Sequence, residues 1–134
     1  HQHIPGLNAK LYGVEIATNS KGLRDREFTY KKTVGIRRIL FLGDSLTLGW
    51  GVPFEDTFTK VLERKLPKID GKITEVINTG VGNYNSEQEY TYYKVEGHKY
   101  NPDHVMLLYF INDAEPTPIY MEPFFIDKSI FLVF

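Results

Sequence analysis

The chain of 134 residues contains no cysteine, which excludes disulfide bonds and thiolate chemistry. Its formal net charge of −1 gives no electrostatic reason to expect nucleic acid or an anionic membrane surface as a partner. No apolar run reaches the roughly 18–20 residues of a membrane span, and the N-terminus lacks the basic and then apolar pattern of a signal peptide. Nucleic-acid binding and membrane spanning are therefore not expected.

Motifs for nucleotides and metals are also missing. Residues 80–85 begin like a dinucleotide-binding fingerprint but lack its third glycine, and no Gly-Lys-Ser/Thr exists for a phosphate-binding loop. His1 and His3 form a His-x-His pair at the end of the chain, which we interpret as a flexible tail. We therefore expect no cofactor and no metal.

Two regions differ in pattern along the chain. Residues 1–35 are irregular, and we predict a surface lead-in with short edge strands near 11–17 and 27–31. Residues 36–134 alternate regularly between strand and helix patterns and indicate one partial α/β domain. Four basic residues of the lead-in are predicted to form a solvated face: Arg24, Arg26, Lys31 and Lys32.

The regular region predicts strands at 37–42, 73–78 and 104–111, with helices at about 54–66 and 86–97 between them. Pro67 ends the first helix, and Ser86 with Glu89 forms a capping box that opens the second. Three tyrosines of the second helix are expected to pack in the core: Tyr90, Tyr92 and Tyr93. Short connections between alternating strands and helices predict a parallel sheet with flanking helices, which is an α/β fold of flavodoxin-like type.

The strongest functional signal is in residues 39–46, which read Ile-Leu-Phe-Leu-Gly-Asp-Ser-Leu. A buried strand ends here, and Ser45 is expected to expose its hydroxyl beside the next helical turn. Asp44 is expected either to orient this turn or to cap the short helix after it. Because parallel strands share one carboxyl edge, Ser45, the 79–85 loop and Asn112 should converge where open α/β sheets bind ligands.

Three blocks in this order, each at a predicted strand end, resemble the GDSL or SGNH family of serine esterases. They are residues 43–46 (Gly-Asp-Ser-Leu), 78–83 (Asn-Thr-Gly-Val-Gly-Asn) and 112–113 (Asn-Asp). Residues 19–25 (Asn-Ser-Lys-Gly-Leu-Arg-Asp) also resemble the lead-in of a bacterial subgroup. The resemblance implies an SGNH hydrolase-type sheet with the strand order second, first, third. It also implies later strands that are missing here, so that the fold is truncated to three core strands.

By this resemblance the protein is a serine ester hydrolase or acyltransferase acting on a short acyl ester, with an acetylated carbohydrate as one candidate. Ser45 would be the nucleophile, and its own N–H would be one oxyanion donor. A second donor would be the backbone N–H of Asn83, which follows Gly82 and stands where the family has glycine. Asparagine tolerates the left-handed backbone that such a glycine serves. The side chain of Asn112 would be the third donor.

Two further polar residues of the matched blocks are assigned supporting roles. Asn78 is expected to organise its loop through side-chain-to-backbone hydrogen bonds. Asp113 is expected to cap or brace the loop after the third strand.

The family's last block, Asp-x-x-His, is absent, because no histidine here has an aspartate three residues before it. His98 ends the second predicted helix and His104 starts the third strand, so both are expected at the sheet edge opposite Ser45, about 20 Å away for His104. We therefore expect the chain to be the N-terminal part of a longer esterase. A partner chain that supplies the base, or a relative that binds without turnover, are the alternatives.

Two other functions stay open. One is a non-catalytic carbohydrate- or ester-binding module on the same fold, and the other is a flavodoxin-like regulatory or nucleotide domain, which would bind its ligand without Ser45. A three-stranded sheet leaves the third strand at an open edge, and residues 130–134 are apolar, so we expect self-association through strand pairing. The compartment also stays open, with a bacterial extracytoplasmic or periplasmic location favoured over the cytoplasm.

Overall fold

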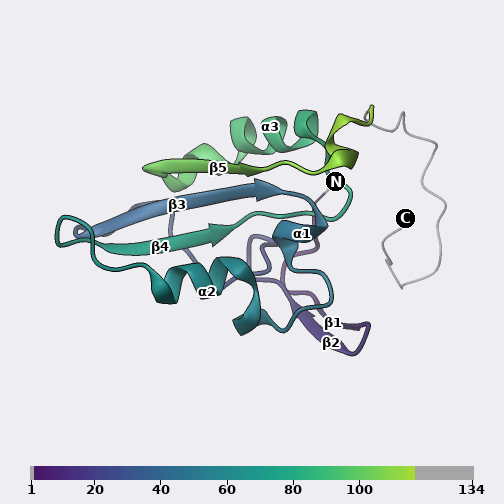
Figure 1. The fold of residues 1–134 in the computed structure, drawn as a ribbon, viewed down its shortest axis with the longest axis horizontal. Helices are drawn as coiled ribbons and strands as arrows, with labels where there is room; N and C mark the ends of the chain where they lie inside the picture. The colour runs from purple at the N-terminus through teal and green to yellow at the C-terminus, as the bar shows by residue number, and fades with distance from the viewer. Residues whose placement is uncertain (1, 117–134) are drawn as a thin grey trace.

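The computed structural model describes residues 2–116, except for the side chain of Asn112. A β-hairpin precedes a parallel sheet with helices on both faces (Figure 1). The strands are β1 (Asn8–Leu11), β2 (Val14–Ala17), β3 (Ile36–Gly43), β4 (Ile73–Asn78) and β5 (His104–Leu108). The α-helices are α1 (Ser45–Leu48), α2 (Phe58–Lys65) and α3 (Ser86–Val95), and short 3₁₀ helices are η1 (Phe54–Asp56), η2 (Gly97–Tyr100) and η3 (Ile111–Ala114).

The main sheet has three strands in the order β4-β3-β5, all parallel. The predicted α/β class, the parallel sheet and the flanking helices are thus confirmed, and the strand order is the one that the resemblance implies. The register pairs Ile39 with His104 and Gly43 with Leu108. As a result, all three strands end at the same edge.

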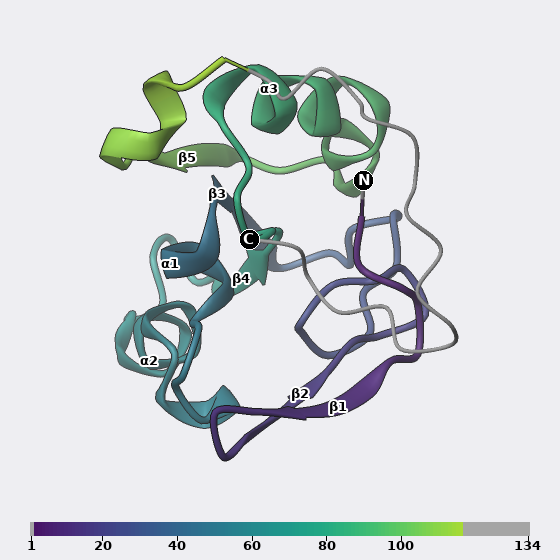
Figure 2. The same cartoon turned by 90° about the vertical axis from the view of Figure 1, so that its right-hand side faces the viewer.

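Alternation along β3 explains why helices cover both faces of the sheet. Leu40 and Leu42 point to one face, where they join a cluster with Tyr92 of α3. Phe41 points to the other face and meets Phe58 of α2, with the ring centroids 5.2 Å apart in an edge-on arrangement. Figure 2 shows α2 and α3 on opposite sides of the sheet accordingly.

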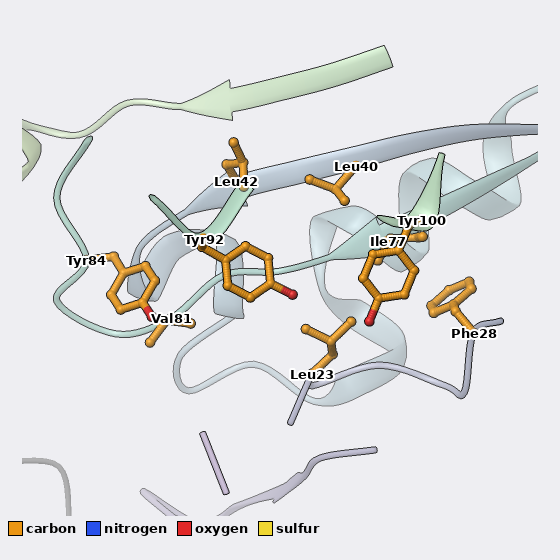
Figure 3. Packing of buried hydrophobic residues seen from close by; sticks show 9 residues of the cluster. All are labelled: Leu23, Phe28, Leu40, Leu42, Ile77, Val81, Tyr84, Tyr92 and Tyr100. Atoms are coloured by element: carbon orange, nitrogen blue, oxygen red, sulfur yellow. The ribbon is translucent and has the colours of Figure 1, made fainter. Parts of the chain in front are cut away.

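The lead-in contributes to the core, so the prediction that it lies on the surface is wrong for this part of it. Leu23 and Phe28 pack in the same cluster as Ile77 and Tyr100 (Figure 3). Arg24, predicted to be solvated, is only 2% exposed. A sequence of mixed polarity gave no periodicity from which this burial could be inferred.

The edge strands of the lead-in also differ from the prediction. β1 and β2 form an antiparallel hairpin, whereas residues 27–31 form no strand. The hairpin turn is Tyr12-Gly13, with φ values of 48° and 80°. Two positive φ values are typical of the type I′ turn, whose twist matches that of paired strands.

Several predicted boundaries are corrected as well. Thr57 is extended (ψ 144°) and separates η1 from α2, so the first helix is not continuous. The capping box is formed by Asn85 and Gln88, one residue earlier than predicted. Glu89 is buried in the structure. Tyr92 is buried as expected, whereas Tyr90 is 62% exposed, so the prediction that it packs in the core is wrong.

The third strand is shorter than predicted, because β5 ends at Leu108 and the chain then turns into η3. β5 pairs with β3 alone among the described strands, and its side chains are largely exposed. Leu107, for example, is 51% exposed. The apolar run 130–134 lies outside the described residues. Among the described helices, none has the length and apolarity needed to cross a membrane.

Among the described strands β5 has one edge without a partner, and this predicts self-association. We expect the apparent mass in analytical ultracentrifugation to rise with concentration, and Leu107→Lys to shift the chain toward monomer, because a charge on an edge strand opposes strand pairing. Val34→Lys, at a fully exposed position (100%), is the matched control and should change nothing. A wild-type chain that is monomeric at all concentrations would contradict this prediction.

Candidate active site

The expected convergence at the carboxyl edge of the sheet is present in the backbone. Ser45 begins α1 directly after β3, and η3, which contains Asn112, follows β5 at the same edge (Figure 1). The loop after β4 continues alongside β3, since the Val81 N–H donates to the Gly43 carbonyl (3.1 Å). Three segments distant in sequence therefore surround the turn that carries Ser45.

The Ser45 turn is held by a buried N-cap. The carboxylate of Asp44 accepts a hydrogen bond from the Leu46 N–H (2.9 Å), and its carbonyl accepts one from Leu48 N–H (3.0 Å). Of the two roles considered for Asp44, capping is the one observed. Ser45 is partly exposed, and its N–H donates to no described residue. Neither the hydroxyl nor the N–H of Ser45 has a hydrogen-bond partner among the described residues.

Arg24 holds the other end of α1, a role that sequence analysis missed. Its guanidinium donates to the carbonyls of Leu48 (3.0 Å), Gly49 (2.6 Å) and Val52 (2.7 Å). The last carbonyls of a helix have no intrahelical donor, so a buried cation with several N–H groups satisfies them well. The resemblance of residues 19–25 to a family lead-in was the signal that could have pointed to Arg24.

Asn78 ties the loop after β4 to α1. Its amide nitrogen donates to the Thr47 carbonyl (2.7 Å) and to the Thr59 hydroxyl (3.2 Å). Its amide oxygen accepts from the Gly80 N–H (2.9 Å), and its own N–H donates to Asp25 (2.9 Å). These four bonds make Asn78 the organiser of this loop.

Asp25 is itself anchored by a buried lysine, which the sequence analysis also missed. Lys60 donates to Asp25 (2.7 Å), to the Val76 carbonyl (3.1 Å) and to Glu63 (3.1 Å). Burial raises the pKa of Asp25, while Lys60 and the N–H of Asn78 oppose this rise. The lead-in is therefore connected to the second matched block through buried polar contacts.

Two glycines of the matched blocks are explained by close packing. A Cβ on Gly80 would lie 2.3 Å from the backbone nitrogen of Leu48 and 2.6 Å from the carbonyl carbon of Thr47. A Cβ on Gly43 would lie 2.0 Å from the hydroxyl of Thr47. Because no real Cβ approaches so closely, α1 can sit against the strand ends only if both positions are glycine.

Asn83 has the left-handed backbone (φ 61°) that was expected of it. It is exposed, follows the buried Gly82, and its N–H donates to no described residue. This N–H therefore stays a candidate oxyanion donor. The position of the Asn112 side chain lies outside the described part of the structure.

The loop after β5 is braced by Asp113. Its carboxylate accepts from the Phe110 N–H (2.7 Å), and its N–H donates to the Phe110 carbonyl (2.9 Å). Burial and the carboxylate of Asp44 raise the pKa of Asp113, and the bond from Phe110 opposes this. Asn85 joins the start of α3 to the same region by donating to the Glu115 carbonyl (2.9 Å).

His98 and His104 lie too far from Ser45 to act as its base. His104 pairs with Ile39, six residues before Ser45, which corresponds to about 20 Å along the strand. His98 lies in η2 beyond the far end of α3, so both are at the opposite edge as expected. The ring of His3 is bonded to Gly22 and burial lowers its pKa, so His3 is not part of a flexible tail.

No group of three metal-ligating side chains occurs among the described residues.

A comparison with protein-family models found no match, and neither did a comparison with curated proteins.

The packing at Gly80 gives a direct prediction. Gly80→Ala should lower the free energy of unfolding by about 3 kcal/mol, because the added Cβ meets backbone atoms of α1 that cannot rotate away. Gly51→Ala, at φ 72° with nothing within 4 Å of the added Cβ, should cost only about 1 kcal/mol from backbone strain. Urea unfolding of both variants measures the difference, and equal losses would contradict the close approach.

Proposed function

We propose that this chain carries the nucleophile and oxyanion-binding groups of a GDSL/SGNH-type serine esterase or acyltransferase with a flavodoxin-like fold. The observation that carries the proposal is the fixed turn around Ser45. Asp44 caps its start and Arg24 binds its end, while the serine itself stays partly exposed. A nucleophile held in place before the substrate arrives loses little entropy on reaction.

In the proposed reaction, the Ser45 hydroxyl attacks the carbonyl carbon of a short acyl ester. The C–O bond to the alcohol then breaks, the alcohol leaves with a proton, and the acyl group stays on Ser45 until water or another alcohol takes it. The negative charge on the carbonyl oxygen would be stabilised by the N–H groups of Ser45 and Asn83 and by the amide of Asn112. A small acyl group, such as acetyl on a carbohydrate, is the proposed substrate class.

The base that removes the Ser45 proton is proposed to lie on sequence outside this chain, on an Asp-x-x-His segment. In support, His98 and His104 are both at the wrong edge of the sheet. The same observation favours a second candidate function, which is a non-catalytic module that binds esters or carbohydrates on this fold.

A chain without its base should be a poor enzyme. We expect hydrolysis of p-nitrophenyl acetate to stay close to the background of the Ser45→Ala variant, because loss of the histidine of a catalytic triad costs about 10⁶ in kcat. Ser86→Ala serves as the matched control for loss of a serine. Robust turnover by the wild type that Ser45→Ala abolishes would show that a base is already present.

A covalent probe tests the nucleophile itself. We expect a fluorophosphonate to label Ser45, slowly alone and faster when free imidazole is added, because imidazole replaces the missing base. Mass spectrometry locates the label, and Ser45→Ala should lose it while Ser86→Ala keeps it. If Ser45 reacts no faster than Ser20 or Ser86 with imidazole present, the esterase proposal fails and the binding module is favoured.

A further inference from the structure

Three buried carboxyl groups, those of Asp44, Glu89 and Asp113, interact electrostatically with one another, and sequence analysis assigned none of them to a shared role. Asp44 comes from the turn between β3 and α1, Glu89 from the first turns of α3, and Asp113 from η3. Their exposed fractions are 2%, 1% and 4%. The first of these elements carries Ser45 itself, η3 follows β5 at the same edge of the sheet, and α3 begins directly after the 79–85 loop.

The three carboxyl groups differ in how many of their oxygens accept a hydrogen bond. Asp44 accepts from the Leu46 N–H, and one oxygen of Asp113 accepts from the Phe110 N–H. The other oxygen of Asp113 and both oxygens of Glu89 are buried without a hydrogen-bond partner. Buried carboxylates rarely lack hydrogen-bond donors, because a charged group that loses its hydration needs other donors to replace the water.

A single proton on one of the three carboxyl groups would reduce the charge repulsion among them. Ionised carboxylates that interact in a low-dielectric interior repel one another, and this repulsion favours the protonation of one of them. Glu89 is the member with no N–H donor to stabilise its charge. Burial, together with the charges of Asp113 from η3 and Asp44 from the β3–α1 turn, raises its pKa to about 7.

We propose that Glu89 is a positioning residue, whose protonated carboxyl bridges the turn that carries Ser45 and the loop that carries Asn112. The inference rests on the proposed function for its catalytic meaning. The proton comes from solvent, and in this proposal the O–H of Glu89 donates to the oxygen of Asp113 that otherwise has no hydrogen-bond partner. When the proton returns to solvent, three carboxylates repel each other and the two loops lose this connection.

The raised pKa of Glu89 determines how the free energy of unfolding changes with pH. A carboxyl whose pKa is higher in the folded than in the unfolded chain favours folding at low pH, and this contribution is lost as the pH rises. For Glu89 the loss falls between its ordinary pKa of 4.5 and about 7. Glu89→Gln should remove the dependence, because its amide is neutral and keeps a donor at every pH.

An NMR titration of the full chain tests the bridge without any enzyme assay. We expect one carboxyl ¹³C resonance, absent in Glu89→Gln, to titrate near pH 7. The amide resonances of Leu46 and Phe110 should shift with the same midpoint in the wild type and not in Glu89→Gln. Glu87→Gln, in the same helical turn but exposed, is the control and should behave as the wild type.

If no carboxyl titrates above about pH 6, or if the two amides do not follow it, the bridge is overturned. Should Glu89→Gln fail to fold, the wild-type titration compared with Glu87→Gln decides the same question.

A pH profile then separates positioning from a merely structural role. The ratio of Ser45 labelling rates, wild type to Glu89→Gln, should fall several-fold between pH 6 and pH 8.5, whereas a pH-independent ratio contradicts the positioning role. Absence of labelling in every variant would contradict the proposed esterase, and the NMR titration would still decide whether Glu89 bridges the loops. The two failures are thus distinguishable.

Discussion

The close packing of α1 against the ends of β3 and β4 is the constraint on which the rest of the site depends. Gly43 and Gly80 allow this approach, since any side chain there would collide with Thr47 or with the backbone of Leu48. Asn78 then fixes the distance by donating to the Thr47 carbonyl. A four-residue helix has almost no stability of its own, so tertiary contacts must hold it in place.

The fold was predictable from sequence where the signal is local. The apolar run before Ser45 and the helix patterns between the runs predicted a parallel sheet, because such strands are buried on both faces. The exact residue at which a helix begins was harder to predict. Either Asn85 with Gln88 or Ser86 with Glu89 fits a capping box, and only packing decides that Glu89 points inward.

The contacts that hold the site were much less predictable. Arg24 binds the end of α1 across more than twenty residues of sequence, and Asp25 meets Lys60 and Asn78 across longer separations. Each of these side chains looks like an ordinary surface charge in its own segment. No periodicity marks it as buried, because its partners are backbone groups or a side chain far away in the sequence, which only the folded chain brings together.

Ser45, Asn83 and Asn112 are proposed to act on one oxygen atom, and a crystal structure of the chain with a phosphonate bound to Ser45 tests this most directly. We expect the phosphoryl oxygen to lie about 2.7–3.1 Å from the backbone nitrogens of Ser45 and Asn83 and from the amide nitrogen of Asn112. A phosphoryl oxygen directed to solvent, with the Asn112 amide turned away from it, would contradict the account.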